Sequence, residues 1–171
     1  MNLHDLPIGD KAPETVLAVI EIPTGSHIKY EYDHELGLMK LDRILHSPMF
    51  YPTDYGFLPQ TLAEDGDPLD VIVLTDTPVF PGCLAELRPI GKMAMLDGGE
   101  RDDKILCVQL GNPHYTHLRE LEDVAPQLLD EIAHFFAQYK FLEKKTVVVE
   151  GWSDRESAYS AIRTAIAAFK N

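Results

Sequence analysis

Three aspartates within six residues form the most chemically suggestive feature of this sequence. The segment 65–70 reads Asp-Gly-Asp-Pro-Leu-Asp and leads directly into the apolar stretch Val71–Leu74. Because glycine and proline break a helix there, we expect Asp65, Asp67 and Asp70 to gather where a strand begins. Such a concentration of negative charge is costly unless cations relieve it. Oxygen ligands of this kind suit Mg²⁺ or Mn²⁺.

A second acidic segment, 97–104, lies in a glycine-rich stretch between two expected strands. It reads Asp-Gly-Gly-Glu-Arg-Asp-Asp-Lys and offers Asp97 and Asp102 as further oxygen ligands. A single Asp-Gly-Asp turn is more often a polar turn whose aspartates accept hydrogen bonds from the backbone. Two acidic segments exceed what surface solvation needs, although charge alone leaves a metal site and a polar surface about equally favoured.

Other common metal and nucleotide motifs do not fit. An EF-hand loop beginning at Asp65 would place Asp70 where glycine is required, and Asp76 where the bidentate glutamate belongs. The histidines are scattered, no His or Cys set has zinc spacing, and His134 beside two phenylalanines is better interpreted as structural. The chain contains neither a GxxxxGK[ST] loop nor a GxGxxG motif.

A metal site that hydrolyses a phosphate ester or anhydride also needs cations to hold the anion, and the chain has only 15 lysines and arginines. Four of them are candidates for this role because of where they stand in the sequence: Lys29, Arg43, Lys104 and Lys140. Each of these, taken alone, is more often a solvated surface charge. Tyr51 and Tyr55 are more often core residues, although a phenol can donate a hydrogen bond to a phosphate oxygen.

The elements that must position these groups are mostly short strands. Strands are expected at 15–22, 27–32, 71–74, 84–90, 92–95, 104–110 and 147–149, where β-branched and apolar residues cluster or alternate. Helical spacing of apolar residues predicts one helix with Pro126 in its first turn. A second helix is expected to open at Ser153, because Glu156 completes a capping box. Many strands followed by helices favour a closed or nearly closed barrel with helices packed outside.

Length and charge restrict the class of protein. With 171 residues, one domain spanning 1–171 is expected, and the formal charge of −13 disfavours nucleic acid and anionic lipid as partners. The two cysteines form no CxxC pair, so a reducing cytosol is the expected compartment. The N-terminal residues lack a secretory pattern, and no apolar run is long enough to span a membrane.

Taken together and in order, these residues resemble the soluble inorganic pyrophosphatases of family I, in their compact bacterial form. The resemblance begins at the segment 21–26, includes the tyrosine segment 51–57 and the highly specific segment 65–71, and ends at Gly151-Trp152. It implies an α+β, mainly β fold: an OB-like, five-stranded closed barrel with two C-terminal helices packed outside. It also implies Mg²⁺-dependent hydrolysis of pyrophosphate to two phosphates, with Mn²⁺ as an alternative metal, in a cytoplasmic homohexamer.

The same resemblance implies roles for individual positions. Asp67 matches the general base of the family. The implied phosphate-binding residues are Lys29, Arg43, Tyr55, Lys104, Tyr139 and Lys140. The implied metal ligands are Asp65, Asp70, Asp97, Asp102, Glu31 and, more loosely, Glu21.

The sequence departs from the family pattern at a few positions, and it is also compatible with two other functions. The stretch after Lys140 is one residue shorter than the family pattern, which leaves the role of Lys144 and Lys145 open, and Arg101 and Phe141 are also unusual. One alternative is a different phosphohydrolase or a DxD-type nucleotide-sugar enzyme, although the chain is short for a sugar transferase. The other is a non-enzymatic acidic metal-binding or OB-type module, which the cations beside the acids disfavour.

Overall fold

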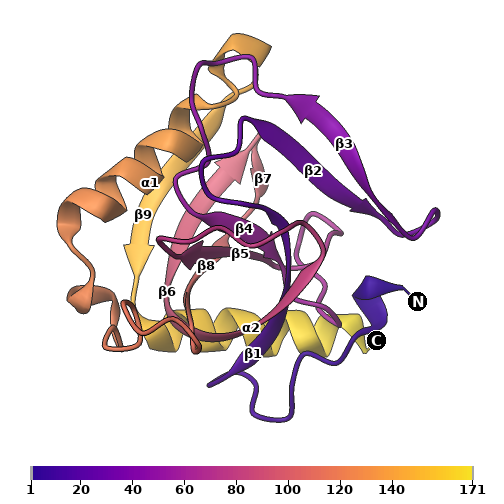
Figure 1. Ribbon diagram of the computed structural model, residues 1–171, viewed down its shortest axis with the longest axis vertical. Helices are drawn as coiled ribbons and strands as arrows, with labels where there is room; N and C mark the ends of the chain where they lie inside the picture. Colours follow the sequence, from indigo (N-terminus) through magenta and orange to yellow (C-terminus); the bar gives the residue numbers. More distant parts are fainter. Residues whose placement is uncertain (1, 171) are drawn as a thin grey trace.

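The computed structural model describes residues 2–170, which form mostly strands together with two α-helices (Figure 1). The strands are β1 (Val16–Ile22), β2 (Ile28–Asp33), β3 (Leu38–Ile44), β4 (Asp54–Phe57), β5 (Asp70–Leu74), β6 (Cys83–Asp97), β7 (Glu100–Arg101), β8 (Lys104–Gln109) and β9 (Val147–Ser153). The helices are α1 (Pro126–Gln138) and α2 (Arg155–Phe169), with 3₁₀ turns η1 (Leu3–Asp5), η2 (Leu121–Asp123) and η3 (Phe141–Glu143).

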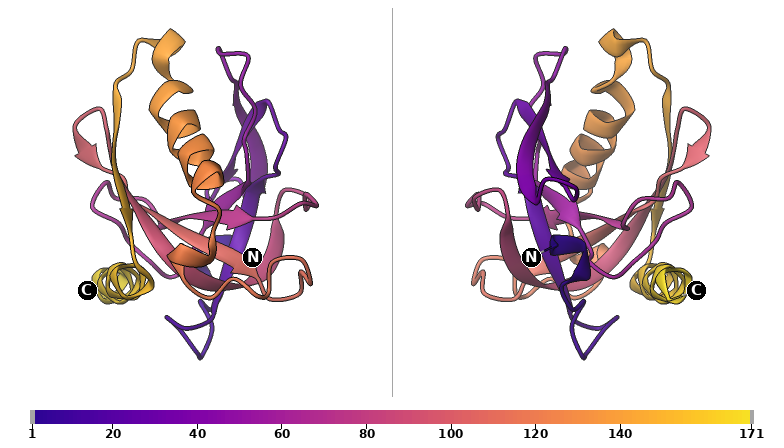
Figure 2. Two further views of the ribbon diagram at one scale, coloured as in Figure 1. Left: turned by 90° about the vertical axis from the view of Figure 1, so that its left-hand side faces the viewer. Right: turned by 90° about the vertical axis from the view of Figure 1, so that its right-hand side faces the viewer.

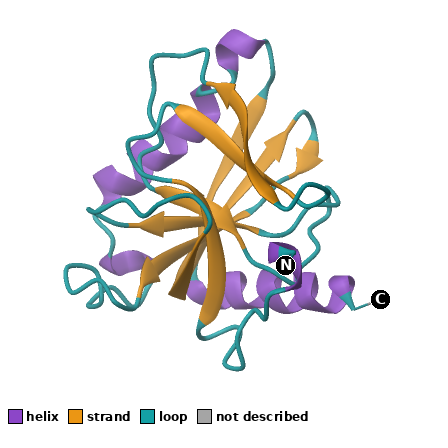
Figure 3. Ribbon diagram, turned by 45° about the vertical axis from the view of Figure 1, so that its right-hand side comes forward, coloured by secondary structure: helices purple, strands orange, loops and turns teal. Residues whose placement is uncertain are grey.

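Five strands close into a ring. Their order is β1–β4–β5–β8–β6, and β6 pairs back with β1. The pair β5–β8 is parallel and the other four pairs of the ring are antiparallel. Strands β7 and β9 extend from β6, while β2 and β3 form a separate hairpin. The predicted five-stranded closed arrangement with two C-terminal helices is thereby confirmed (Figure 3).

Closure of the ring depends on a glycine where β4 meets β1. A Cβ atom at Gly56 would lie 1.9 Å from the carbonyl oxygen of Val19 and 2.8 Å from the Cα of Ile20. Both are backbone atoms, so no side-chain rotation could relieve the clash. The absence of a side chain at Gly56 therefore lets the two backbones approach, and it fixes the adjacent Tyr55 at this crossing.

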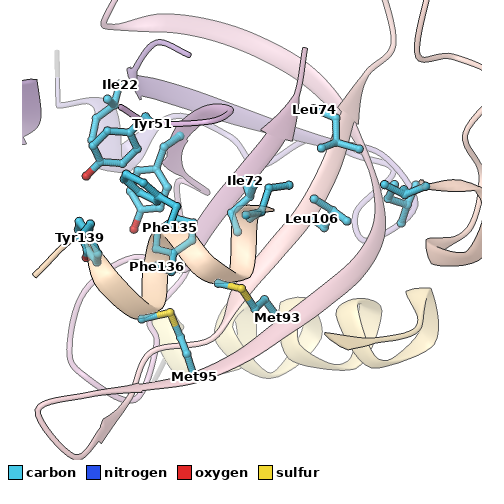
Figure 4. Close-up of a cluster of buried hydrophobic side chains, with 14 of the residues drawn as sticks. Ile22, Tyr51, Ile72, Leu74, Met93, Met95, Leu106, Phe135, Phe136 and Tyr139 are labelled. Atoms are coloured by element: carbon cyan, nitrogen blue, oxygen red, sulfur yellow. The ribbon is translucent and has the colours of Figure 1, made fainter. Parts of the chain in front are cut away.

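Alternate residues of the ring strands enter two different hydrophobic clusters. The first, which we call the aromatic cluster, contains Tyr51, Tyr55, Phe135, Phe136 and Tyr139 with aliphatic residues such as Ile72 and Leu106 (Figure 4). The second, the aliphatic cluster, includes Val71, Ile105, Cys107, Ala158, Ile162 and Ala165. Helix α1 contributes to the first cluster and helix α2 to the second, so the strands between them are buried on both faces.

Two details of the predicted elements are wrong. Helix α2 is capped by Asp154, whose carboxylate accepts a hydrogen bond from the backbone N–H of Ser157 at 2.9 Å. Ser153 is instead the last residue of β9, where it pairs with Lys92 of β6. The strands expected at 84–90 and 92–95 form one continuous strand, β6. A bulge after Pro89 shifts the pairing of β6 with β8, and this lets the strand continue past the proline and Gly91.

The layout leaves one end of the ring flanked by two elements. Helix α1 and the hairpin β2–β3 rise on the same side of the ring, while α2 runs along its other end (Figures 1 and 2). The C-terminal end of α1 and the hairpin are thus available to one site from opposite sides. Among the described residues, no helix has the length and apolar character needed to cross a membrane.

Candidate active site

A pocket of about 310 Å³ collects most of the residues singled out from the sequence. The expected site residues that line it are Glu21, Lys29, Glu31, Tyr55, Asp65, Asp67, Asp70, Asp97, Asp102, Tyr139 and Lys140. They come from β1, β2 and β4, from the loop between β4 and β5, from the strand ends around β5 to β8, and from the end of α1. The remaining two expected residues, Arg43 and Lys104, do not line the pocket itself.

Lys104 lies beneath the pocket and joins two of its aspartates. Its ammonium is 2.7 Å from a carboxylate oxygen of Asp70 and 2.6 Å from one of Asp102, and the residue is only 1% exposed. The parallel pairing of β5 with β8 sets Asp70 opposite Lys104, so this contact follows from strand register. Burial alone would lower the pKa of Lys104, but the two carboxylates outweigh it and raise the pKa.

Two further lysines of the pocket wall pair with acids that also line it. Lys140, just after α1, contacts Asp97 at the end of β6, and Lys29 of the hairpin contacts Glu31. Lysine ammonium groups form such pairs as compact point charges on flexible stems, so they can exchange partners readily. The pocket therefore holds both signs of charge, with its cations at the hairpin and at the end of α1.

Arg43 has an unused hydrogen-bond donor. It lies opposite Lys29 in the β2–β3 register, donating from Nη1 to Asp42 at 2.6 Å and from Nε to Glu143 at 3.1 Å. Its Nη2 is buried and has no hydrogen-bond partner among residues 2–170. A buried donor left unpaired is costly, so the arrangement suits an anion that would accept this hydrogen bond.

Two tyrosines bring phenol groups to the site. Tyr55 donates a hydrogen bond to Asp70, and its ring lies 5.5 Å from the ammonium of Lys104. Tyr139 stacks on Phe135 with ring centroids 5.1 Å apart. Burial raises the pKa of both phenols well above the ordinary value, so both stay neutral hydrogen-bond donors at physiological pH.

Burial in the pocket disfavours the charged form of several of its carboxyl groups. Glu21 is 8% exposed, accepts a 2.7 Å hydrogen bond from the backbone N–H of Tyr32, and has its pKa raised to about 8 by burial. Burial also raises the pKa of Asp65 and Asp102, and neighbouring aspartates add to the effect. Cations would relieve this accumulation of carboxylates.

The donor chemistry fits Mg²⁺ without a closed protein cage. The acidic set supplies only carboxylate oxygens, and within residues 2–170 no three His, Cys, Asp or Glu side chains already converge as a metal-holding group. Mg²⁺ usually keeps several waters and is held by one or two carboxylates together with substrate phosphates. Zinc and other softer metals, by contrast, favour His and Cys ligands.

The pocket also contains residues that sequence reasoning did not place there. His4, Tyr32, His34, Tyr51, Phe57 and Pro68 complete its wall. The rings of His4 and His34 stack with centroids 5.6 Å apart, and the spacing of the histidines gave no signal for this. Tyr51, which was considered beside Tyr55 from the sequence but not assigned to the site, lines the pocket as well. Arg101, in the second acidic segment, contacts Asp103 and Glu150 and does not line the pocket.

Fold and site together define a class of protein: a small closed β-barrel whose pocket suits a dense anion accompanied by divalent cations. The family model for inorganic pyrophosphatase matches residues 18–170. The chain therefore belongs to the inorganic pyrophosphatase family.

Similar proteins cover the chain along its whole length. An inorganic pyrophosphatase of Synechocystis is 47% identical over 170 residues, covering 99% of this chain and 100% of the relative. The crystal structure of inorganic pyrophosphatase from Thermus thermophilus has a TM-score of 0.97 and 48% identity, with 100% of both chains covered. An inorganic pyrophosphatase structure from Helicobacter pylori has a TM-score of 0.93 at 37% identity, covering 97% of this chain and 99% of that one.

Proposed function

We propose that this chain, as one domain spanning residues 1–171, is an inorganic diphosphatase that hydrolyses pyrophosphate to two phosphates with Mg²⁺. The observation that carries the proposal is the single pocket in which five aspartates face lysine and tyrosine side chains. A dense anion and divalent cations need such a mixed site, whereas a plain polar surface does not. Membership of the family gives the substrate its identity.

The cations and phenols would hold the substrate. Lys29 and Lys140, now paired with Glu31 and Asp97, can turn to phosphate oxygens, and Arg43 offers its unpartnered Nη2. The hydroxyl of Tyr139 would add an oriented hydrogen bond, and Lys104 would reinforce the positive charge from below. Tyr55 donates its single O–H to Asp70, so it would donate to phosphate only by exchanging that acceptor. These groups also stabilise the negative charge that develops on the leaving phosphate.

The carboxylates would hold Mg²⁺, with Mn²⁺ as the alternative metal. The proposed ligands are Asp65, Asp70, Asp97, Asp102, Glu31 and, more loosely, Glu21. The chemistry supplied by the metal, when bound, is neutralisation of phosphate charge and acidification of the attacking water. Tyr55 and Lys104 fix the carboxylate of Asp70 from behind, which orients its remaining lone pairs toward the pocket.

Asp67 is the proposed general base. It is exposed to the pocket, and within residues 2–170 no lysine or arginine forms a salt bridge with it. Its backbone N–H donates to the Asp65 carboxylate at 3.1 Å, which keeps both side chains on one short turn. A carboxylate placed in this way can accept the proton of the attacking water.

We further propose a homohexamer in the cytoplasm, with no membrane or nucleic-acid partner. The support is the resemblance to the compact bacterial pyrophosphatases, together with the net charge of −13. Large apolar side chains such as Phe80 and Phe141 are exposed on the single chain and could be covered by other copies. Light scattering on the purified protein should give the hexamer mass; the mass of a monomer would refute the assembly.

Phosphate release from pyrophosphate, measured with and without Mg²⁺, tests the activity directly. ATP and a simple phosphate monoester serve as comparison substrates. Rapid release from pyrophosphate only in the presence of metal is the expected result. No release with any divalent metal would refute the enzyme and favour a binding module, while preference for a monoester would assign a different phosphohydrolase.

The role of Asp67 is tested by Asp67→Asn, with the exposed Asp130→Asn as a control for charge removal. Loss of a general base typically costs about 10²- to 10⁴-fold in turnover. Asp67→Asn should therefore lose activity on this scale at saturating Mg²⁺ while keeping its fold, and Asp130→Asn should resemble the wild type. Near-normal turnover in Asp67→Asn would rule out the assigned base.

A further inference from the structure

One buried hydroxyl ties together both ends of the loop that carries two pocket aspartates. The Oγ1 of Thr61 donates to the carbonyl of Leu58 at 2.6 Å and accepts from the N–H of Leu69 at 2.9 Å. The N–H of Leu58 in turn donates to the carbonyl of Leu69 at 2.9 Å. Thr61 is 2% exposed, and Leu58 and Leu69 are likewise buried, so no solvent replaces these bonds.

The loop 59–68 between these two ends presents Asp65 and Asp67 to the pocket. Inside it, the N–H of Ala63 donates to the carbonyl of Asp67 at 2.8 Å, and the N–H of Gly66 donates back to Ala63 at 3.2 Å. These bonds make the tip a compact turn. Its position relative to Asp70, the first residue of β5, is therefore set where the loop joins the ring.

Outside that junction, the hydrogen bonds that attach the loop to other described elements come from Gln60 and Leu62, and they include a 3.3 Å bond from the Gln60 side chain to the carbonyl of Asp5. The N–H of Leu62 donates to the carbonyl of Ala165 in α2 at 3.0 Å, and that of Gln60 donates to the carbonyl of His4 at 3.0 Å. Thr61 is the side chain that spans from one end of the loop to the other. Its loss would leave a buried carbonyl and a buried N–H without this partner.

We propose that Thr61 is a positioning residue for the reaction: its hydroxyl holds Asp65 and Asp67 in register with Asp70. The proposal rests on the pyrophosphatase function and on the roles assigned above to these aspartates. Thr61 does not line the pocket, so it acts through the loop and not on the substrate. Small displacements of reacting groups are costly, since a shift near 1 Å can slow a reaction by about 10²-fold.

The other end of β5 provides a matched control. Thr75 follows the strand and makes the same kind of bridge, donating to the carbonyl of Thr77 at 2.8 Å and accepting from its N–H at 3.1 Å. Thr75 is 9% exposed, so it too is a largely buried hydroxyl with one donated and one accepted bond. Its turn carries none of the pocket residues, which separates loss of stability from loss of positioning.

The experiment compares Thr61→Val, Thr61→Ser and Thr75→Val with the wild type. For each we would measure kcat, KM, the Mg²⁺ concentration for half-maximal activity, and hydrogen exchange at the amide of residue 69. Thr61→Val should lower kcat by roughly 10- to 100-fold, raise the Mg²⁺ requirement several-fold, and speed exchange at residue 69. Thr61→Ser should restore all three values, and Thr75→Val should change none of them.

A purely structural role would look different. If Thr61→Val lost thermal stability like Thr75→Val but kept kcat and the Mg²⁺ requirement, the proposal would be wrong. If Thr61→Val did not fold, Thr61→Cys would replace it, because a thiol is a weaker hydrogen-bonding group than a hydroxyl. Thr61→Cys should show smaller changes in kcat, the Mg²⁺ requirement and exchange at residue 69. No change in these three quantities would also refute the proposal.

Failure of the proposed function can be told apart from failure of this inference. Wild-type protein that releases no phosphate would refute the diphosphatase. Mg²⁺ binding by calorimetry and exchange at residue 69 would then decide the role of Thr61 without reference to activity. Weaker Mg²⁺ binding in Thr61→Val than in Thr75→Val supports positioning of the aspartates, and equal binding refutes it.

Discussion

The aromatic cluster and the aliphatic cluster share the same strands but differ in what their side chains can do besides pack. In β5, Ile72 enters the first and Val71 the second, so each strand serves both. The aromatic cluster also contains Tyr55 and Tyr139, which line the pocket, whereas no described residue of the aliphatic cluster lines it. The aromatic cluster thus contributes side chains to the pocket, whereas the aliphatic cluster contributes to the stability of the fold.

The difference follows from the residue types. A tyrosine buries a large apolar ring and still offers a hydroxyl, so it can belong to a core and to a site at once. Tyr51 packs against Phe135 with centroids 4.8 Å apart and also lines the pocket. Valine, isoleucine and alanine have no such polar end. Substitutions in the two clusters should therefore separate effects on activity from effects on stability.

The largest expected effect comes from Gly56→Ala, which breaks both clusters at once. The added methyl would collide with the backbone of β1, as the 1.9 Å approach to the Val19 oxygen requires. No folded protein should be recovered, as judged by circular dichroism and soluble expression. Gly111→Ala, where a Cβ meets nothing within 4 Å, is the control and should fold. If Gly56→Ala unfolded cooperatively at the wild-type temperature, the claim that β4 and β1 approach too closely for a side chain at residue 56 would be wrong.

Phe136→Ala should damage stability and activity together. The Phe136 ring lies 5.9 Å from that of Tyr55 and 5.9 Å from the ammonium of Lys104, so its removal frees two groups behind the pocket. Truncating a buried phenylalanine costs about 3–5 kcal/mol. Urea unfolding would give the loss of stability, and kcat, measured under conditions where the variant is folded, should also fall. Unchanged kcat would mean that the aromatic cluster does not support the site.

Ile162→Ala is the matching truncation in the aliphatic cluster, in helix α2. The residue is fully buried, so the expected loss is about 2–4 kcal/mol from burial and cavity formation. We expect kcat and KM to stay at wild-type values in the folded variant, because Ile162 does not line the pocket. A marked fall in kcat would refute the claim that the aliphatic cluster affects stability and not activity.

The smallest effect is a difference in thiol reactivity that needs no substitution. Both cysteines are free; Cys107 is buried in the aliphatic cluster, and Cys83 is half-buried. Burial raises the pKa of the Cys107 thiol, so little thiolate is available. A thiol reagent should label Cys83 readily and Cys107 only on unfolding. Equal labelling of both would mean that the aliphatic cluster opens in the native state.

Much of the fold could be predicted because its buried elements have clear patterns. Val71–Leu74 is apolar and bounded by acids, and α1 has helical spacing after Pro126. The hairpin strand β3 was not predicted, since Leu38, Leu41 and Ile44 are exposed and do not alternate toward a core. Strand β4 was missed because it is only four residues long and contains Gly56. A glycine is needed there because β1 approaches closely, and the sequence gives no sign of that approach.

Most residues that line the candidate pocket could be predicted from the sequence, but their contacts could not. Acidic spacing pointed to Asp65, Asp67 and Asp70, and the resemblance supplied the cations. That Lys104 lies beneath Asp70 and Asp102 depends on the parallel register of β5 and β8, which pattern alone does not fix. His4 and His34 reach the wall only because the N-terminal turn packs beside the hairpin, a long-range contact without a local signal.

The pairing of β6 back onto β1 has a consequence for association between chains. Each of the five ring strands has a strand partner on both sides, so their backbone N–H and C=O groups are already used. Exposed edge strands are templates on which other chains can aggregate. Strand addition is therefore confined to the outer edges of β2, β3, β7 and β9, and the body of the molecule is protected against edge-to-edge growth even when its concentration is high.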